Sequence, residues 1–262
     1  MNDNKFDPWF NMIPNSALEE LANPIAHEIG QGLGGIASLI FNPARKLGII
    51  SRKNIEDFEE KIYSKTDKIP QENRDNSKQG LALKALEDSA YQLESDDLRE
   101  MFSNLISSTL DNSKNDKVHP SFSSLLKDMS SSDAKLFNII YRENQTPITS
   151  VKAVKNNTND YIYLSEFNLL LPDKKIISDK NESIDLLKRL GLISILDKSP
   201  VISEQYLKRY ENYEKSSHFE AIKSFHINSF DIKREFHLSL QRGHIKLTHI
   251  GKAFGDCVIN DQ

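Results

Sequence analysis

Histidines are the first candidates for chemistry in this sequence, because five of the seven lie close together near the C-terminal end. A metal site on a helix would place two histidines four residues apart, usually with a carboxylate nearby. No two of these five have that spacing. We therefore expect no metal site and interpret the five as scattered surface and core residues. They are His218, His226, His237, His244 and His249.

A nucleophilic site would need a serine or cysteine beside a base that a third group orients. His119 precedes Pro120 and has Ser121 nearby, but no residue in this stretch is spaced to orient such a pair. His119 therefore fits the entry to a helix better. The sequence also has no phosphate-binding loop, no G-x-S-x-G elbow and no H-E-x-x-H motif. We expect a protein without catalytic residues, metal or cofactor.

Cys257 is the single cysteine, which excludes an intramolecular disulfide. It lies in the apolar run FGDCVI, so we expect it to be a small buried hydrophobic residue. The first residues lack the basic start and apolar core of a secretion signal. Together these features predict a cytoplasmic protein. The net charge of −4 argues against nonspecific nucleic-acid binding over the whole surface.

Gly30, Gly32 and Gly35 match the dinucleotide-binding pattern G-x-G-x-x-G. That fingerprint needs a buried strand immediately before the glycines, whereas the preceding NPIAHEI has helical spacing. A glycine in a helix costs about 1 kcal/mol relative to alanine, so Gly30 and Gly34, one turn apart, indicate close packing of another backbone. The uncharged stretch 29–44 is shorter than the ~20 apolar residues of a membrane span. Association with a membrane surface through this stretch is an alternative.

The C-terminal part of the chain has the element order with which a winged helix ends. The segment ESIDLLKRLGLISIL (182–196) predicts a helix, a glycine turn and a strand. The segment GHIKLTHIGKAFGDCVI (243–259) predicts a second strand and a closing helix. The residues between them, 197–242, place three tyrosines on one helical face. They predict a helical insertion at the position of the wing.

The rest of the chain has the spacing of amphipathic helices. Over residues 50–65, Ile55, Phe58 and Ile62 share one face and charged side chains the other, and helical spacing resumes at residue 81. Ser95 in ESDD and Ser130 in SSSD are each expected to cap the start of a helix. We predict a mainly α protein of the α+β class, in which an N-terminal helical bundle precedes the winged-helix-like domain. Its parts are an N-terminal helical region with a glycine-rich helix (1–65), a polar linker (66–80), a helical domain (81–130) and the winged-helix-like domain (131–262).

Recognition of DNA by the C-terminal domain would place the helix 181–190 in the major groove. Lys188 and Arg189 would favour phosphate contacts, but Glu182 and Asp185 lie on the same short helix and would repel phosphates. The charge pattern therefore favours docking to protein. A DNA-binding regulator is kept as an alternative.

A run in the middle of the chain that includes LREMFSNLI, HPSF and SSSDAKL resembles a known bacterial family. Together with NPIAHEIG upstream, it is similar to the Abi-alpha (abortive infection alpha) family over residues 20–145. The resemblance implies phage resistance in which infected cells stop growing or die before phage is released. The molecular function of the family is unknown, so no catalytic residues carry over. Arg99, His119 and Asp133 are the matching polar positions that we would test first.

We therefore predict a non-enzymatic interaction protein of bacterial antiphage defence that binds a macromolecular partner. We expect that partner to be a protein and the chain to form a homo-oligomer. The alternatives are a DNA-binding regulator, a membrane-active effector acting through residues 29–44, and an enzyme whose site is assembled from dispersed residues. The interaction candidates are Arg99, His119, Asp133, Lys188, Arg189, Gly30 and Gly34.

Overall fold

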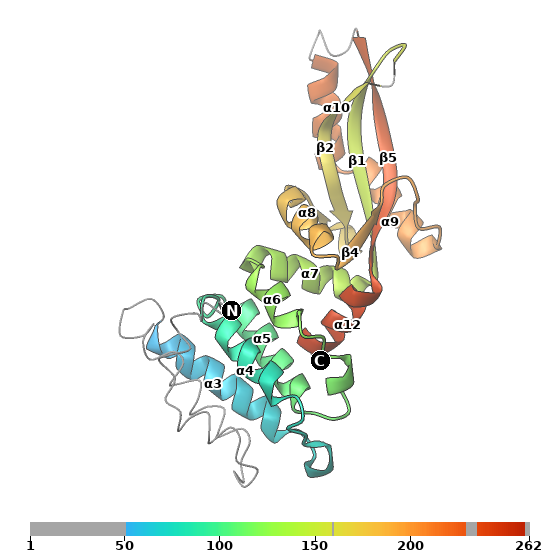
Figure 1. Cartoon of the computed structure of the whole chain (residues 1–262). Coiled ribbons are helices and arrows are strands. Elements are labelled where there is room, and N and C mark those ends of the chain that lie inside the picture. Colours follow the sequence, from blue (N-terminus) through green and yellow to red (C-terminus); the bar gives the residue numbers. More distant parts are fainter. Residues whose placement is uncertain (1–50, 159, 229–234, 260–262) are drawn as a thin grey trace, which may run out of the picture. The chain divides into compact units, whose positions relative to one another are not determined.

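The computed structural model describes residues 51–158, 160–228 and 235–259 of the chain (Figure 1). These residues form nine α-helices and one antiparallel sheet of five strands. The predicted combination of helices with a smaller share of strands is therefore confirmed. No helix in this described part has both the length and the apolar character needed to cross a membrane.

The chain divides into two compact units. The first unit comprises residues 1–135 and 253–262, and the second comprises residues 136–252. The boundary falls inside helix α7 (Ser131–Glu143) and again inside helix α12 (His249–Val258). The sequence predicts the last domain boundary at residue 130, just before α7, and places all of α12 in the C-terminal domain.

Four complete helices form most of the described part of the first unit. They are α3 (Arg52–Asp67), α4 (Gln79–Ser89), α5 (Asp96–Thr109) and α6 (Phe122–Lys127). Helix α3 shows why these segments are helical, because its apolar residues recur every three or four positions and so share one face. Ile55, Phe58 and Ile62 form that face, and all three are buried, as the sequence predicted.

Polar caps fix where two of the helices begin. The Ser95 hydroxyl oxygen accepts a hydrogen bond from the Leu98 N–H (3.3 Å) at the start of α5. Before α7, the Ser130 N–H donates to Asp133 Oδ2 (2.8 Å), and the Asp133 N–H donates to Ser130 Oγ (3.3 Å). Each cap satisfies N–H groups that have no partner within the helix. Both helix starts agree with the sequence prediction.

Residues 66–80, predicted as a linker, lie within the first unit. They contain a short 3₁₀ turn, η2 (Gln71–Asn73). Ile69 is buried, and the Asp75 N–H donates to the carbonyl oxygen of Leu110 (2.9 Å). Backbone hydrogen bonds therefore hold a segment whose composition is too polar to predict packing.

The last residues of α12 belong to the first unit, where α5 contacts them. Asn104 Nδ2 donates to the carbonyl oxygen of Val258 (2.8 Å), and Ser108 Oγ donates to that of Cys257 (3.0 Å). These bonds satisfy carbonyl groups that lack partners at the end of a helix. Cys257 is 2% exposed, and burial raises the pKa of its thiol to about 11. The prediction that this cysteine is a buried small hydrophobic residue is confirmed.

The second unit is built on the antiparallel sheet, whose strand order is β3-β2-β1-β5-β4. Figure 1 labels β2, β1, β5 and β4 of this sheet. Strand β1 lies at the centre and pairs with β2 on one side and β5 on the other. All residues from 146 to 153 of β1 are buried. The strands are β1 (Gln145–Lys155), β2 (Tyr161–Leu170), β3 (Ile176–Ile177), β4 (Ile193–Leu196) and β5 (Phe236–Leu247).

Three helices lie in the second unit with the sheet. They are α8 (Asn181–Arg189), α9 (Glu204–Glu214) and α10 (Ser217–Asn228). Helices α9 and α10 occupy the region for which the sequence predicted a helical face. Tyr210 and Tyr213 of α9 are buried in one core cluster with Val151 of β1 and Leu170 of β2. The part of the sheet face that carries this cluster is therefore covered.

Strand β5 is longer than the sequence predicted. We expected it to begin near Gly243 and assigned the residues before it to the helical insertion, whereas it begins at Phe236. Leu238 and Leu240 pack against the same core as the tyrosines of α9. Their spacing of two residues is that of a strand. The charged and aromatic residues upstream had made a continuous helical insertion the simpler prediction.

The first turn of α12 contains Gly251, a position with no room for a side chain. Thr248 Oγ1 accepts a hydrogen bond from the Gly251 N–H (2.9 Å) and donates to the carbonyl oxygen of Gly191. A Cβ atom on Gly251 would overlap the carbonyl oxygen of Leu192. Because that oxygen is a backbone atom, it cannot rotate away. Glycine at this position lets the start of α12 approach the strand that follows α8.

Replacing Gly251 with alanine is expected to lower the free energy of unfolding by about 1–3 kcal/mol, the usual cost of overpacking. Urea denaturation followed by circular dichroism measures this change. Gly80→Ala in α4 is the matched control, because a Cβ there meets nothing within 4 Å. It should be neutral or stabilising by roughly 0.5–1 kcal/mol. Equal stability of the two variants would contradict the close approach.

Candidate functional site

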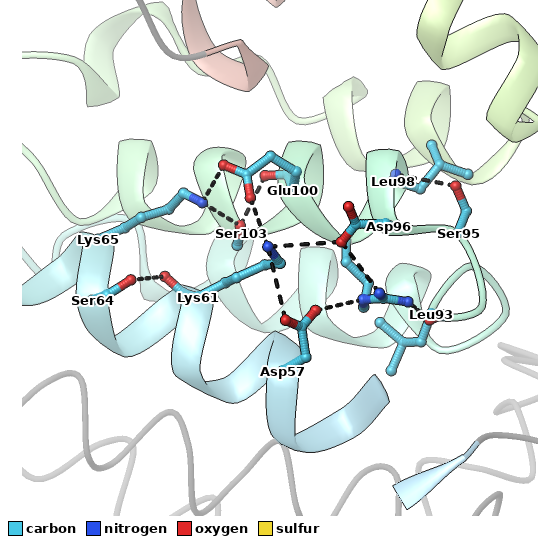
Figure 2. A network of polar contacts seen from close by, with 11 residues as sticks. Asp57, Lys61, Ser64, Lys65, Leu93, Ser95, Asp96, Leu98, Glu100 and Ser103 are labelled. Carbon is cyan, nitrogen blue, oxygen red and sulfur yellow. Dashed lines mark hydrogen bonds and ion pairs between the residues drawn. The ribbon is translucent and has the colours of Figure 1, made fainter. Parts of the chain in front are cut away.

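Arg99, the first polar candidate from the sequence, lies in a charged network between α3 and α5. Figure 2 labels its partners Asp57, Leu93 and Asp96. Arg99 is 8% exposed. Its Nε donates to Asp57 Oδ2 (2.7 Å). Its terminal nitrogens donate to the carbonyl oxygen of Leu93 and to Asp96 Oδ1 (3.2 Å). A buried guanidinium is stable only when its donors and charge have such partners, so these contacts fix Arg99 in place.

Two lysines of α3 extend the same network along α5. Figure 2 shows Lys61 and Lys65 reaching toward Glu100. Lys61 Nζ lies 3.2 Å from Glu100 Oε2 and 3.7 Å from Asp96 Oδ1. Lys65 Nζ lies 2.6 Å from Glu100 Oε1 and also donates to Ser103 Oγ (3.0 Å). The network contains three cations and three carboxylates, so its charges cancel and it joins the two helices.

Burial and the neighbouring charges shift the pKa values of this network in opposite directions. Burial lowers the pKa of Lys65, and the hydrogen bond with Glu100 offsets only part of that effect. Burial would raise the pKa of Glu100, but the hydrogen bonds and charges of Lys65 and Lys61 outweigh it and lower that pKa. For Lys61 the carboxylates outweigh burial and raise the pKa. The pairing therefore favours the ionised form of the carboxylate at its centre.

A second charged cluster joins α4 to α6. Lys84 Nζ lies 2.5 Å from Asp88 Oδ2, and Lys127 Nζ lies 3.2 Å from Asp88 Oδ1. Lys84 also donates to Ser123 Oγ (2.7 Å). Burial opposes ionisation of Asp88, but Lys84, Ser123 and Lys127 together lower its pKa. As in the first network, a carboxylate lies between cations and links neighbouring helices.

The other two candidates in the first unit also have local partners. Asp133 is buried and caps α7 through its contacts with Ser130. His119 is exposed, and its Nδ1 accepts a hydrogen bond from the Ser121 N–H (3.2 Å) just before α6 begins. This is the helix-entry geometry expected from the sequence. Arg99, His119 and Asp133 thus lie on different elements, each engaged with neighbours of its own.

The remaining candidates lie elsewhere. Lys188 and Arg189 are exposed in the last turn of α8, where positive charge interacts favourably with the helix dipole. Gly30 and Gly34, with the rest of the stretch 29–44, lie outside the described residues. Within the part of the chain that is described, no group of three or more histidines, cysteines or carboxylates is arranged to hold a metal ion.

A different candidate surface appears on β2, whose outer neighbour, the two-residue strand β3, pairs only with its end. Tyr161, Ile162 and Tyr163 of β2 are exposed by 48%, 47% and 38%, although all three are large and apolar. We call these three residues the β2 surface. Successive side chains of a strand point to opposite faces of the sheet, so the exposed area wraps around the strand. Single exposed apolar residues are common, whereas three in succession make this segment a candidate binding surface.

Lys152, on the neighbouring strand β1, contacts the rings of both tyrosines of the β2 surface. The residue is 7% exposed, and its Nζ lies 4.0 Å from the centroid of the Tyr161 ring and 4.7 Å from that of Tyr163. Gln241 Oε1 accepts a hydrogen bond from the same amino group (2.9 Å). The two rings meet edge to face with centroids 5.3 Å apart. Cation–π attraction and ring packing therefore order the side chains.

The ionisation of Tyr163 reflects these surroundings. Partial burial, together with Tyr161 and the carboxylates of Glu166 and Asp197, raises the pKa of Tyr163 to about 12. The hydroxyl is therefore neutral at physiological pH. The surface offers apolar area and hydrogen-bonding groups.

The β2 surface is not among the sites predicted from the sequence. The run YIYL follows an asparagine-rich turn, which was the one available signal. A run of apolar residues without alternation is equally typical of a strand buried on both faces. Only the position of β2 in the sheet distinguishes these two cases.

Replacing Arg99 with methionine is expected to lower the free energy of unfolding by about 3–5 kcal/mol, because Asp57 and the Leu93 carbonyl would lose a buried partner. Urea denaturation measures the loss. Arg52→Met is the matched control, since that side chain is 76% exposed in its contact with Glu56; it should cost about 0.5 kcal/mol or less. Similar losses in both variants would show that Arg99 does not join the helices.

The free energy of unfolding at acidic pH should depend on Glu100. Because its pKa in the folded protein is lowered from 4.5, Glu100 adds stability above that pH. The added stability is lost as the pH falls through the folded pKa. In Glu100→Gln, the fall in unfolding free energy below pH 4.5 should be shallower than in the wild type. Parallel curves in this range of urea denaturation experiments would contradict the assignment.

Comparison with known proteins identifies a family to which this sequence is similar. The sequence pattern of the family described as abortive infection alpha matches residues 50–258. Among solved structures, an uncharacterized protein from the hydrocarbon-degrading marine bacterium Alcanivorax borkumensis SK2 is 14% identical, with a TM-score of 0.34 over 53% of this chain and 92% of that chain. A likeness this low supports no conclusion about this chain. No curated protein matched significantly. The family match spans most of the chain and confirms the resemblance found in the sequence, so the protein belongs to the abortive infection alpha family.

Proposed function

We propose that this protein acts in abortive infection by binding a protein partner on the β2 surface. Family membership supports the abortive-infection role. The observation that carries the docking site is the exposure of three consecutive large apolar side chains, Tyr161, Ile162 and Tyr163. Removing apolar area from water contributes about 25 cal/mol per Å². Tyrosine is also enriched among the few residues that dominate binding energy in protein interfaces.

The order of the β2 surface before binding supports this proposal. Lys152 contacts both tyrosine rings, and the rings contact each other. Immobilising a free side chain on binding costs roughly 0.5–1.5 kcal/mol. Here part of that cost is already met in the folded chain, so a larger share of the contact energy is available to the partner.

The polar candidates support a non-enzymatic role. Arg99 and Asp133 are engaged in joining and capping helices, and His119 is engaged at a helix entry. None of the three needs a substrate to explain its contacts. We therefore place the function of the chain in recognition and expect it to take place in the cytoplasm, where the reduced, buried Cys257 would be stable.

The C-terminal elements support a winged-helix-like interpretation, in which α8, β4, β5 and α12 are the last elements of the fold and α9 with α10 replaces the wing. Lys188 and Arg189 on α8 would then be the DNA contacts of a regulator. Glu182 and Asp185 are exposed on the same helix, which weakens attraction to phosphates. A protein partner is therefore favoured. The membrane-active alternative depends on residues 29–44, which the structure does not describe.

The double variant Tyr161→Ser/Tyr163→Ser tests the proposal. If each tyrosine contributes about 1.4 kcal/mol or more to binding, the affinity for the partner falls roughly 100-fold or more. Protection against phage should then fall to the level of cells without the protein. The measurement is the efficiency of plating of a phage panel on a sensitive host that expresses each variant at equal level.

Tyr63→Ser is the matched control, because Tyr63 is an exposed tyrosine on α3. It should protect as the wild type does. Circular dichroism should show the same thermal transition for both variants, so that loss of folding cannot account for the difference. Full protection by the double variant would refute docking on the β2 surface. Equal plating with and without the wild-type protein would refute the abortive-infection role.

A further inference from the structure

We propose that the partner of the β2 surface is a second copy of the same chain, whose β2 strand pairs antiparallel with the first along their free edges. This inference rests on the proposed function in taking the β2 surface as the docking site. It goes further in naming the occupant and the register of the contact. Both follow from the backbone of β2 and from the order of its side chains.

Among the strands that the structure describes, none pairs with the outer edge of β2 over most of its length. Strand β3 pairs with it only through Leu169 and Leu170. Upstream of these residues, no described strand pairs with that edge. An open edge presents a row of unpaired N–H and C=O groups that can pair with another strand. The three residues of the β2 surface lie on this open part.

The hydrogen bonds of the neighbouring turn show which backbone groups point outward. The Lys155 N–H donates to the carbonyl oxygen of Asp160 (2.8 Å), so these two residues form a hydrogen-bonded pair of the β1–β2 ladder. Such pairs alternate with non-bonded pairs along antiparallel strands. Ile162 therefore bonds to β1, whereas the N–H and C=O groups of Tyr161 and Tyr163 point to the open edge. The N–H of the next residue, Asn156, donates instead to the carbonyl oxygen of Glu235 (2.7 Å), just before β5, as this alternation requires.

In a dimer with its twofold axis at Ile162, all outward-pointing N–H and C=O groups of Tyr161 and Tyr163 are hydrogen-bonded. This axis places Tyr161 opposite the partner's Tyr163, and Tyr163 opposite the partner's Tyr161, so that both pairs form two backbone hydrogen bonds each. Ile162 then lies directly opposite the partner's Ile162, and these two side chains are on the face of the sheet opposite to the tyrosines. The same patch contacts itself, as a twofold interface requires. Shifting the axis to either tyrosine would leave one of the three side chains opposite a turn or a polar residue.

The flanking residues are compatible with this register. Asp160 would lie opposite the partner's Leu164, so no like charges meet at this pair. The stretch 161–168 contains no lysine and no proline, the residues that commonly block edge-to-edge pairing. The apolar side chains that are exposed in one copy would be covered by their equivalents in the other.

A cysteine at position 162 tests both the contact and its register. Residues of a non-hydrogen-bonded antiparallel pair have Cα atoms about 4.5 Å apart, within the range of a disulfide. Mild oxidation of Ile162→Cys should therefore link two copies through a reducible bond, seen by non-reducing gel electrophoresis. The native Cys257 is buried and would not compete. Asp160→Cys is the matched control, because in this register its copies lie roughly 14 Å apart, beyond disulfide reach.

Charge at the same position provides a second, reversible test. The contact covers few residues, so we expect a dimer that forms as the protein concentration rises from about 1 to 100 µM. Sedimentation velocity of the wild type should show this shift. Ile162→Lys would bring two like charges together and should stay monomeric, whereas Ile202→Lys on another exposed isoleucine should dimerise as the wild type does.

The results separate this inference from the proposed function. A wild type that stays monomeric, together with an Ile162→Cys variant that forms no more linked dimer than Asp160→Cys, would overturn pairing with a second copy. Loss of phage protection in the tyrosine variant would then still support a different protein partner. Specific linkage through Ile162→Cys with full protection by the tyrosine variant would uphold the dimer and refute its role in defence.

Discussion

The backbone pairing of β1 on both of its sides is the interaction on which the second unit depends. It joins residues 145–155 to 236–246, which are distant in the sequence, and it fixes the insertion of α9 and α10 between them. Because β1 is already paired with β5, β2 can lie only on the other side, where β3 covers no more than its end. The exposure of the β2 surface therefore follows from the order of the strands, and so does the direction in which its free backbone groups point.

In the first unit, the equivalent constraint is the charge pairing between helices. The network around Arg99 and the cluster around Asp88 each place partly or fully buried charges against partners on a neighbouring helix. Removing one partner would leave a desolvated charge, which is far more costly than the net gain from the pair. Polar residues that match a family pattern can thus be fixed by packing alone. This is why we place recognition on exposed apolar side chains.

The features that the sequence predicted well are those set by local geometry. The buried face of α3 and the caps at Ser95 and Ser130 depend on residues within one or two turns, and burial of Cys257 depends on the apolar run around it. The β2 surface could not be predicted in this way, because the same run YIYL would be buried if β2 had a second full-length neighbour. The start of β5 was misplaced for a related reason, since its pairing partner lies about ninety residues away in β1.

Amide hydrogen exchange at three neighbouring residues tests the central claim most directly. In dilute protein, the account predicts slow exchange at Ile162, which bonds to β1, and fast exchange at Tyr161 and Tyr163, whose amides face the open edge. At high protein concentration, exchange at both tyrosines should slow while Ile162 stays unchanged. Tyrosine amides that are already as slow as Ile162 in dilute protein, or that stay fast at every concentration, would contradict an open edge that binds a second copy.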